Sequence, residues 1–163
     1  MILMILAGCL SSKATDTVTA PPAHLAAVDA DTVDWKAKEL PYWKEVLSDE
    51  QVRVCREAGT ERPWSSPLNQ AKDPGVFSCS SCGLHLFPMD AKFDSGTGWP
   101  SFTAPVSEEA VTLHSDFSYG MVRTEVKCGR CDAHLGHVFN DGPAPTGKRY
   151  CINGVCLMHE LAK

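Results

Sequence analysis

The sequence predicts one mainly β domain with a helical cap at its N-terminal end. Two observations lead to this fold class. Apolar residues follow a helical spacing only within residues 34–59. From Gly75 onward, short runs rich in Val, Phe, Thr and Tyr alternate with Gly, Pro, Asn and Asp, which is typical of strands joined by turns. The length of 163 residues fits a single domain of about 100–150 residues and a tail.

The helical cap is expected in two pieces. Pro41 should divide it, because proline interrupts the interior of a helix. Ser48 and Gln51 have the spacing of a capping box, so a second helix should begin near Asp49 and end near Gly59. The apolar residues at approximate helical spacing are Trp35, Leu40, Trp43, Val46 and Leu47.

The second part of the chain is expected to form antiparallel strands separated by turns. The candidate strands lie near residues 76–79, 83–87, 110–114, 117–127, 135–139 and 148–158. Cap and strands together define a predicted domain of residues 34–163, preceded by residues 1–33.

Residues 1–9 resemble a bacterial lipoprotein signal. Leu6-Ala7-Gly8-Cys9 has the form of a lipobox, in which the peptide is cut before a cysteine that is then lipidated. No Lys or Arg precedes Cys9, which departs from the basic start of such signals. Residues 11–31 are polar and without period, as expected of a flexible linker. We therefore expect a periplasmic protein or one anchored to a membrane by lipid; the alternative is a cytoplasmic protein.

Charge and hydropathy argue against two other kinds of partner. The formal net charge is −5 and the pI is about 5.6, whereas phosphate binding needs clustered Lys and Arg. The longest such cluster is Lys148-Arg149, so no nucleic-acid partner is expected. No apolar run approaches the ~20 residues that span a membrane. Membrane contact is therefore expected only through a lipid on Cys9.

Two Cys-x-x-Cys pairs predict a structural metal site. They are Cys79/Cys82 and Cys128/Cys131. Two intervening residues allow a tight turn that aims both thiolates at one ion, and zinc takes four such ligands tetrahedrally. Four thiolates leave no open position, so we expect a structural Zn²⁺ that joins two distant loops. The alternatives are iron in the same site, two disulfides, or a redox-active pair, which would explain one Cys-x-x-Cys but not two.

Cys151 is the candidate nucleophile. On a strand, Arg149, Cys151 and Asn153 would share one face. The reactive form of cysteine is the thiolate, and a cation two residues away favours it. A buried cysteine is otherwise often only a small apolar residue, but these polar neighbours favour reactivity.

Several separated motifs resemble the B-type methionine sulfoxide reductases. The resemblance covers roughly residues 38–160 and includes the two Cys-x-x-Cys pairs of the zinc-binding members. It implies a fold of two antiparallel sheets and the reduction of methionine-(R)-sulfoxide in damaged proteins. The other motifs are Gly59-Thr60-Glu61-Arg62-Pro63, Gly98-Trp99-Pro100-Ser101-Phe102, Met121-Val122-Arg123-Thr124-Glu125-Val126, His134-Leu135-Gly136-His137-Val138-Phe139 and Arg149-Tyr150-Cys151-Ile152-Asn153.

The resemblance also implies roles for individual side chains. The thiolate of Cys151 would attack the sulfoxide sulfur and become a sulfenic acid. His137 and His114 would be the candidates to protonate the leaving oxygen. Trp99 would place an apolar wall against the substrate methyl group, and Phe139 would share in substrate binding.

Three polar residues complete the set that the resemblance implies. Asn153 would hold the polar end of the site through hydrogen bonds. Arg149 and Asp141 match positions that can tune Cys151.

The recycling of Cys151 departs from the commonest pattern of the family. Many members carry a resolving cysteine where this chain has Thr97, whose hydroxyl cannot form a disulfide. Cys55 resembles an alternative resolving position, so we expect a Cys55–Cys151 disulfide that thioredoxin or a similar dithiol reductant opens. Cys156 and direct reduction by an external thiol are the alternatives. If residues 151–156 are extended, Cys156 lies about 16 Å from Cys151, too far for a disulfide without a bend.

Three other functions fit parts of the sequence. A zinc-ribbon interaction module without catalysis would explain the metal site, but not the surroundings of Cys151. A thiol peroxidase would use the same nucleophile on a peroxide. The third alternative is an inactive relative of the family, in which Thr97 in place of a resolving cysteine prevents the recycling of Cys151.

Overall fold

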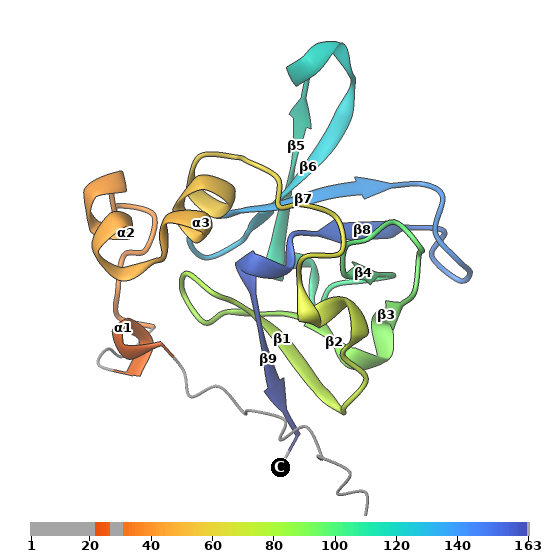
Figure 1. Ribbon diagram of the computed structural model, residues 1–163, viewed down its shortest axis with the longest axis horizontal. Helices are drawn as coiled ribbons and strands as arrows, with labels where there is room; N and C mark the ends of the chain where they lie inside the picture. The colour runs from red at the N-terminus through yellow and green to blue at the C-terminus, as the bar shows by residue number, and fades with distance from the viewer. Residues whose placement is uncertain (1–21, 27–30, 163) are drawn as a thin grey trace, which may run out of the picture.

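Two antiparallel sheets form the body of the protein in the computed structural model, which describes residues 22–26 and 31–162 (Figure 1). This confirms the predicted mainly β fold. The three-stranded sheet has the order β2-β1-β9, with β1 at Gly75–Cys79, β2 at His85–Pro88 and β9 at Leu157–Leu161. The six-stranded sheet has the order β3-β4-β8-β7-β6-β5. Its strands are β3 Lys92–Phe93, β4 Ser101–Phe102, β5 Val111–Asp116, β6 Arg123–Cys128, β7 His134–Phe139 and β8 Arg149–Ile152.

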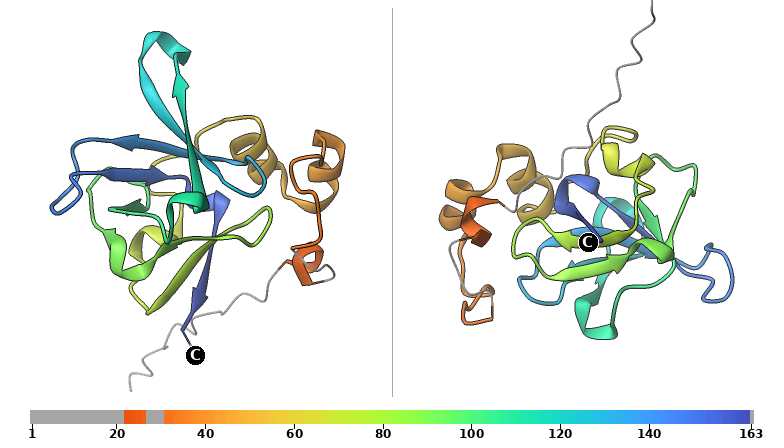
Figure 2. Two further views of the ribbon diagram at one scale, coloured as in Figure 1. Left: turned by 180° about the vertical axis from the view of Figure 1, so that it is seen from behind. Right: turned by 90° about the horizontal axis from the view of Figure 1, so that it is seen from below.

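The predicted helical cap lies beside the sheets, as both views in Figure 2 show. It consists of α2 Leu40–Val46, α3 Asp49–Gln51 and the π-helical turn η1 Val52–Arg56. The capping box is confirmed: Ser48 Oγ accepts from the Gln51 amide, and Gln51 Oε1 accepts from the Ser48 amide. Pro41 is the second residue of α2 and does not divide the cap, because the first turn of a helix needs no amide donor there.

The last predicted strand is wrong as a single element. Residues 148–158 contain β8, the 3₁₀ turn η6 Gly154–Cys156 and the start of β9, so the chain passes from one sheet to the other. The break is held by the Glu61 carboxylate, which accepts the amides of Gly154 at 2.6 Å and Val155 at 2.9 Å. A bond between residues more than ninety positions apart leaves no trace in the local pattern.

Two further differences concern short elements. The prediction of a strand over 117–127 is wrong in its first half, where the 3₁₀ turn η5 Ser118–Gly120 precedes β6. β3 and β4 were not predicted, since two residues each cannot show an alternating pattern.

The core lies between the sheets and joins them. Phe102 of β4 stacks on Phe87 of β2 at 4.5 Å between ring centroids and meets Phe77 of β1 edge-on at 5.0 Å. All three rings are fully buried, and each contributes roughly 1.5–3 kcal/mol by removal from water. The six-stranded sheet is therefore held rigidly against its smaller neighbour.

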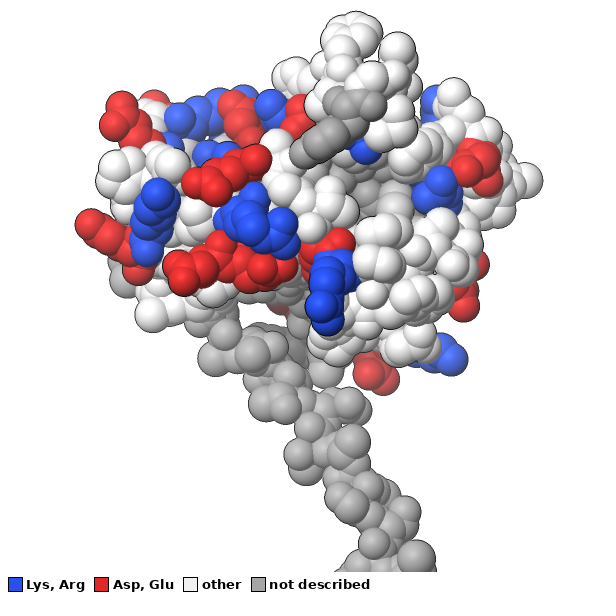
Figure 3. Space-filling model, turned by 45° about the horizontal axis from the view of Figure 1, so that its top comes forward, with Lys and Arg blue, Asp and Glu red and all other residues white. Residues whose placement is uncertain are grey.

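The β5–β6 hairpin projects from this body (Figure 1). Its exposed apolar side chains include Leu113, Phe117, Met121 and Val122. On the face drawn in Figure 3, the projecting part is mostly uncharged, and the basic and acidic side chains on the rest of the face are mixed. Ion pairs such as Arg53–Glu50 and Lys36–Asp132 reflect this mixing.

The predicted lipobox and most of the predicted linker lie outside the described residues. Within that linker, the short helix α1 Ala23–Ala26 contacts the first Cys-x-x-Cys turn, where His24 Nε2 is 3.1 Å from the Ser81 carbonyl oxygen. Asp31 pairs with Arg130 at 3.1 Å. Within the described ranges, none of the helices has the length and apolar character of a membrane span.

Candidate active site and metal centre

A row of polar side chains crosses one face of the six-stranded sheet and contains Cys151. Cys151 of β8 lies directly opposite His137 of β7 on one side and Ser101 of β4 on the other. The row continues to Glu125 of β6 and then to His114 of β5. Directly opposed residues share a face and have Cβ atoms about 4.5–5.5 Å apart. The predicted nucleophile therefore has a histidine as its immediate neighbour.

The two predicted histidines lie at different distances from Cys151. His137 is mostly buried, and its Nε2 is 2.8 Å from Asp116 Oδ2. His114 is three strands away from β8, or about 14 Å along a sheet with ~4.8 Å between strands. Its exposed ring contacts Thr112 Oγ1 at 3.0 Å. The structure thus brings His137, but not His114, beside Cys151.

Asp116 is a site residue that the sequence analysis missed. It lies at the end of β5, where Arg123 donates to it at 2.7 Å and the Ser118 amide at 2.8 Å. Hydrogen bonds from Ser118, and next that from His137, hold the pKa of this carboxyl well below its usual range. Asp116 is therefore ionised at neutral pH and orients the ring of His137. No local motif marks it, because its partners come from the turn and from another strand.

The surroundings of Cys151 do not acidify it overall. Its side chain is partly buried, and its Sγ is 3.9 Å from Thr97 Oγ1. Burial raises the pKa of Cys151 above that of a free thiol, while the hydrogen bond with Thr97 and the charge of Arg149 oppose the rise. Arg149 acts in the expected direction, but desolvation outweighs it. Cys151 is therefore mostly a thiol at neutral pH, and a reaction through its thiolate would need an acceptor for the proton.

Arg149 is bound on two sides. Its Nε and Nη2 donate to Asp141 Oδ1 and Oδ2 at 2.9 and 2.8 Å. Its guanidinium lies 4.4 Å from the centroid of the Phe139 ring. One face of Phe139, a predicted substrate contact, is thus covered by Arg149. This arrangement fixes the direction of the cation near Cys151.

Glu61 ties together three parts of the site. Its backbone carbonyl accepts the indole N–H of Trp99 at 3.2 Å, and its backbone amide donates to Asn153 Oδ1 at 3.0 Å. Its buried carboxylate holds the turn after β8 through Gly154 and Val155. Trp99, the predicted wall of the site, and the end of β8 are therefore both held by Glu61.

The side chain of Asn153 makes hydrogen bonds to two other segments. Its Oδ1 accepts from Glu61, and its Nδ2 donates to the Leu135 carbonyl at 3.0 Å. The side chain is buried and both ends of its amide bond the backbone. These bonds fix the position of Asn153 at the end of β8, and its predicted role at the polar end of the site stays a prediction.

The buried Glu61 carboxyl gives a prediction on stability. Burial raises its pKa, and the bonds from Gly154 and Val155 only partly oppose this. The folded protein then holds this proton more tightly than the unfolded chain, whose glutamate pKa is about 4.3. The free energy of unfolding should therefore fall as pH rises from about 4.3 through the folded pKa. Glu61→Gln should lack this component, which denaturant unfolding of both proteins across the window measures.

The exposed residue Glu45 provides the matched control. Glu45→Gln should keep the wild-type dependence of stability on pH. The interpretation of Glu61 fails if Glu61→Gln and wild type differ by the same free energy at every pH.

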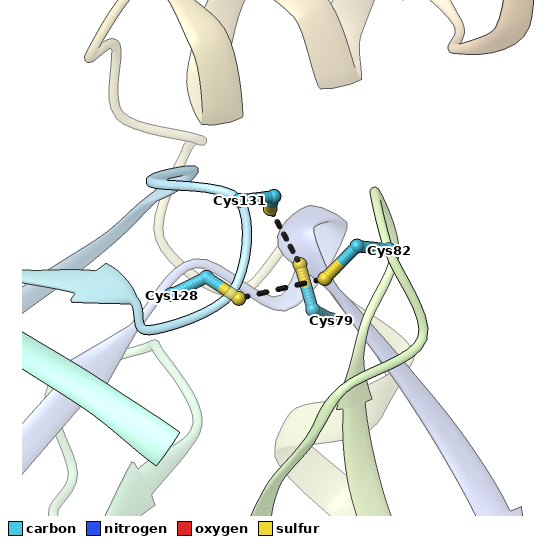
Figure 4. Close-up of side chains that lie close together, drawn as sticks. All are labelled: Cys79, Cys82, Cys128 and Cys131. Carbon is cyan, nitrogen blue, oxygen red and sulfur yellow. Dashed lines mark hydrogen bonds between the residues drawn. The ribbon is translucent and has the colours of Figure 1, made fainter. Parts of the chain in front are cut away.

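Four cysteine sulfurs form a buried cage (Figure 4). Cys79, Cys82, Cys128 and Cys131 are fully buried, and all four Sγ atoms lie within 4.8 Å of one another. The Cys79–Cys131 and Cys82–Cys128 sulfurs are 3.8 and 3.6 Å apart. A tetrahedral ion with bonds of about 2.3 Å to sulfur requires sulfurs about 3.8 Å apart. The cage thus has the size and donor set of a metal site.

The two Cys-x-x-Cys turns have matching backbones. The Gly83 amide donates to Cys79 O at 2.8 Å, and the Asp132 amide donates to Cys128 O at 3.0 Å. Gly83 and Asp132 both have positive φ, at 73° and 56°. The left-handed residue after each second cysteine closes the turn, which is why a glycine suits position 83. Local sequence thus shapes each half of the cage, and the fold brings the halves together.

Cys55 and Cys156 form a disulfide that joins η1 to η6. Their Cα atoms are 5.7 Å apart, and both side chains are fully buried. Cys55 is therefore bonded to Cys156 here, and not to Cys151 as expected. The extended geometry that placed Cys156 about 16 Å from Cys151 does not apply, because η6 bends the chain between them. Cys151 is a free thiol.

Comparison with known proteins places the chain in a family. The SelR domain model matches residues 47–161, which is more than half of the chain. The chain is 58% identical to a peptide methionine sulfoxide reductase MsrB of Pseudomonas paraeruginosa over 74% of this chain and 91% of the relative. It is 57% identical to proteins of the same name from Pseudomonas putida (74% and 92% covered) and Pseudomonas savastanoi (77% and 95%). The chain belongs to the SelR-domain family, together with these B-type methionine sulfoxide reductases.

Proposed function

We propose that this protein reduces methionine-(R)-sulfoxide in oxidised proteins to methionine, with Cys151 as nucleophile. The observation that carries the proposal is the direct opposition of Cys151 and His137 on one sheet face. The 58% identity to a peptide methionine sulfoxide reductase supports the proposed reaction. That this relative is of the B type supports the choice of the R epimer as substrate.

The reaction begins with attack of the Cys151 sulfur on the sulfoxide sulfur. His137 is placed to take the thiol proton and to return it to the sulfoxide oxygen as the S–O bond breaks. Ionised Asp116 stabilises the imidazolium between these two transfers. Overall, the sulfoxide sulfur gains two electrons and the Cys151 sulfur loses two. The released hydroxide then attacks the Cys151 sulfur and breaks the bond between the two sulfurs, so that methionine leaves and the oxygen and the proton end as the hydroxyl of a sulfenic acid on Cys151.

Substrate binding is assigned to the apolar side of the site. The indole of Trp99, held through its N–H by Glu61, offers its ring to the S-methyl group. Phe139, under the Arg149 guanidinium, lies two residues along β7 from His137, on the same face of the sheet. His114 stays a proposed participant at the exposed end of the row, where it would contact the peptide rather than the reacting sulfur.

Substitution of Asp116 tests the assignment of His137. Asp116→Asn should lower kcat by about tenfold, because the neutral amide no longer stabilises a charged imidazole. The pKa of Asp116 is lowered, so the carboxyl stays ionised throughout the neutral range. The loss of activity should therefore be the same at every pH from roughly 6 to 9. Steady-state kinetics across that range is the measurement. Ser118→Ala keeps the carboxylate and is the control; a defect as large as that of Asp116→Asn in this variant would contradict the role of the charge.

The metal that we propose for the cage is zinc. Four thiolates and tetrahedral dimensions match its preference, and full burial leaves no position for substrate. Held by Cys79, Cys82, Cys128 and Cys131, the ion would supply structural cross-linking alone.

Recycling is proposed to pass through an intramolecular disulfide that involves Cys55, opened by thioredoxin or a similar dithiol protein. A lipid anchor at Cys9, and with it a periplasmic site of action, stays a proposal from the sequence. Transfer of radiolabelled fatty acid to the full chain, and its loss in Cys9→Ser, tests the anchor.

Turnover of a peptide with racemic methionine sulfoxide tests the function. With dithiothreitol as reductant and the epimers separated by chromatography, we expect the R epimer to disappear. The S epimer in the same tube is the internal control. If neither epimer is lost in metal-loaded protein, the proposal is overturned in favour of a zinc-ribbon interaction module.

A further inference from the structure

The Cys55–Cys156 pair lies next to the metal cage at both of its ends. The Ser80 amide, inside the first Cys-x-x-Cys turn, donates to Cys156 O at 3.0 Å. Arg56, which follows Cys55, donates to Cys131 O at 2.9 Å and approaches Cys131 Sγ at 3.8 Å. Both halves of the pair are thus already held on the same cage. The disulfide itself joins positions 101 residues apart in the sequence.

Thr97 occupies the space beside Cys151, so a resolving thiol must come from elsewhere. Among the described residues, the cysteines outside the cage are Cys55, Cys151 and Cys156. Cys156 is on the same short segment as Cys151, at the end of the turn that follows β8. Cys55 is on η1, a different segment, and is joined to Cys156 by the disulfide. Of the two, Cys156 is the thiol that a short chain movement can bring to Cys151.

The movement that is required involves only the turn after β8. Its hydrogen bonds to other segments are those from the Gly154 and Val155 amides to the Glu61 carboxylate, from the Gln51 side chain to Val155 O and from the Ser80 amide to Cys156 O. Local opening of such a turn costs less than global unfolding. Because Cys156 is fully buried when the turn is closed, opening must precede both its reaction with Cys151 and its reduction.

We propose that Cys156 is a relay cysteine, which takes the oxidation from Cys151 and passes it to Cys55. This inference rests on the proposed sulfoxide reduction. The Cys156 thiol attacks the Cys151 sulfenic sulfur, a Cys151–Cys156 disulfide forms, and the hydroxyl leaves with the thiol proton as water. The Cys55 thiolate then attacks Cys156 Sγ, which breaks the first disulfide and returns Cys151 to its thiol. The product is the Cys55–Cys156 disulfide of the structure, which an external dithiol reduces while becoming a disulfide itself.

The relay predicts the yield of methionine without external reductant. Fully reduced enzyme should convert about two equivalents of sulfoxide, one stored as the Cys55–Cys156 disulfide and one as sulfenic acid on the regenerated Cys151. An enzyme whose pair is only a structural cross-link should convert about one equivalent.

The experiment uses full-length, zinc-loaded enzyme that carries Cys9→Ser, so that every counted thiol lies in the described part of the chain. It is reduced with dithiothreitol, freed of it by gel filtration and mixed with excess methionine-(R)-sulfoxide peptide. Methionine is quantified, and the linkages are mapped by mass spectrometry after acid quench and alkylation. Cys55→Ser should give about half the wild-type yield and accumulate the Cys151–Cys156 link. Cys156→Ser should also give half and leave a sulfenic acid that dimedone traps on Cys151.

Several results would overturn the relay. A Cys55–Cys151 link in Cys156→Ser would make Cys55 the direct resolver. About one methionine per reduced wild-type enzyme, with Cys55 and Cys156 still thiols, would make the pair a structural cross-link. A pair that dithiothreitol cannot open in the native enzyme would also contradict the relay. By contrast, absence of methionine from all of these proteins would contradict the proposed function itself.

Discussion

Replacement of Cys151 with serine is expected to lower turnover of methionine-(R)-sulfoxide by about 10⁴-fold or more, because a serine hydroxyl does not form the sulfenic intermediate. Cys151 is the only thiol on the polar row of the sheet, opposite His137. The substitution replaces one sulfur atom with an oxygen atom in a half-buried side chain, so the fold and the metal content should be unchanged. Peptide turnover with dithiothreitol, measured beside zinc content, is the test.

Thr97→Ser is the matched control for this variant. It keeps the hydroxyl that lies 3.9 Å from Cys151 Sγ and should stay within about threefold of wild-type activity. Substantial turnover in Cys151→Ser would mean that another thiol performs the attack, and would remove the basis for the role of His137.

Removal of one cage ligand is expected to have the largest effect on stability. In Cys128→Ser, three thiolates and a hydroxyl replace the four-thiolate site, and metal affinity should collapse. Structural zinc contributes about 10–16 kcal/mol in small domains, whereas whole domains are stable by only about 5–15 kcal/mol. Loss of the metal would thus remove about as much free energy as the whole domain has. We therefore expect Cys128→Ser to bind roughly less than one tenth of the wild-type zinc and to lose its cooperative unfolding transition. Metal analysis and thermal unfolding measure both effects.

Ser81→Ala is the control within the same turn. The Ser81 hydroxyl is buried with no hydrogen-bond partner among the described residues, so its removal should cost little or even stabilise. The variant keeps all four sulfurs and should keep a full equivalent of metal. Retention of zinc and of a wild-type transition in Cys128→Ser would show that the cage is not a four-ligand site.

The metal cage was predictable from the sequence because each half is local. Two residues between cysteines set the turn, and a residue with positive φ closes it, at Gly83 in one half and Asp132 in the other. The alternation of short apolar runs with turn residues was likewise sufficient for the fold class, since strand and turn propensities act over a few residues. The candidate nucleophile was indicated by the motif around residue 151.

Contacts between distant segments were not predictable in this way. The choice between His137 and His114 depends on strand order, which puts one opposite Cys151 and the other three strands away. The end of β8 depends on the carboxylate of Glu61. A sequence motif contains Glu61, but it does not indicate that Gly154 and Val155 are its bonding partners. The partner of Cys55 depends on a turn that bends the chain after Ile152.

The chain's local patterns were therefore enough to predict its fold class, its four-cysteine cage and its candidate nucleophile, because spacing over a few residues specifies turns, strands and paired thiolates. Folding alone established that Cys55 meets Cys156 across a separation of 101 residues and that His137 faces the thiol. The physical reason is that register and long-range hydrogen bonds depend on how whole strands pack, and no window of sequence contains both partners.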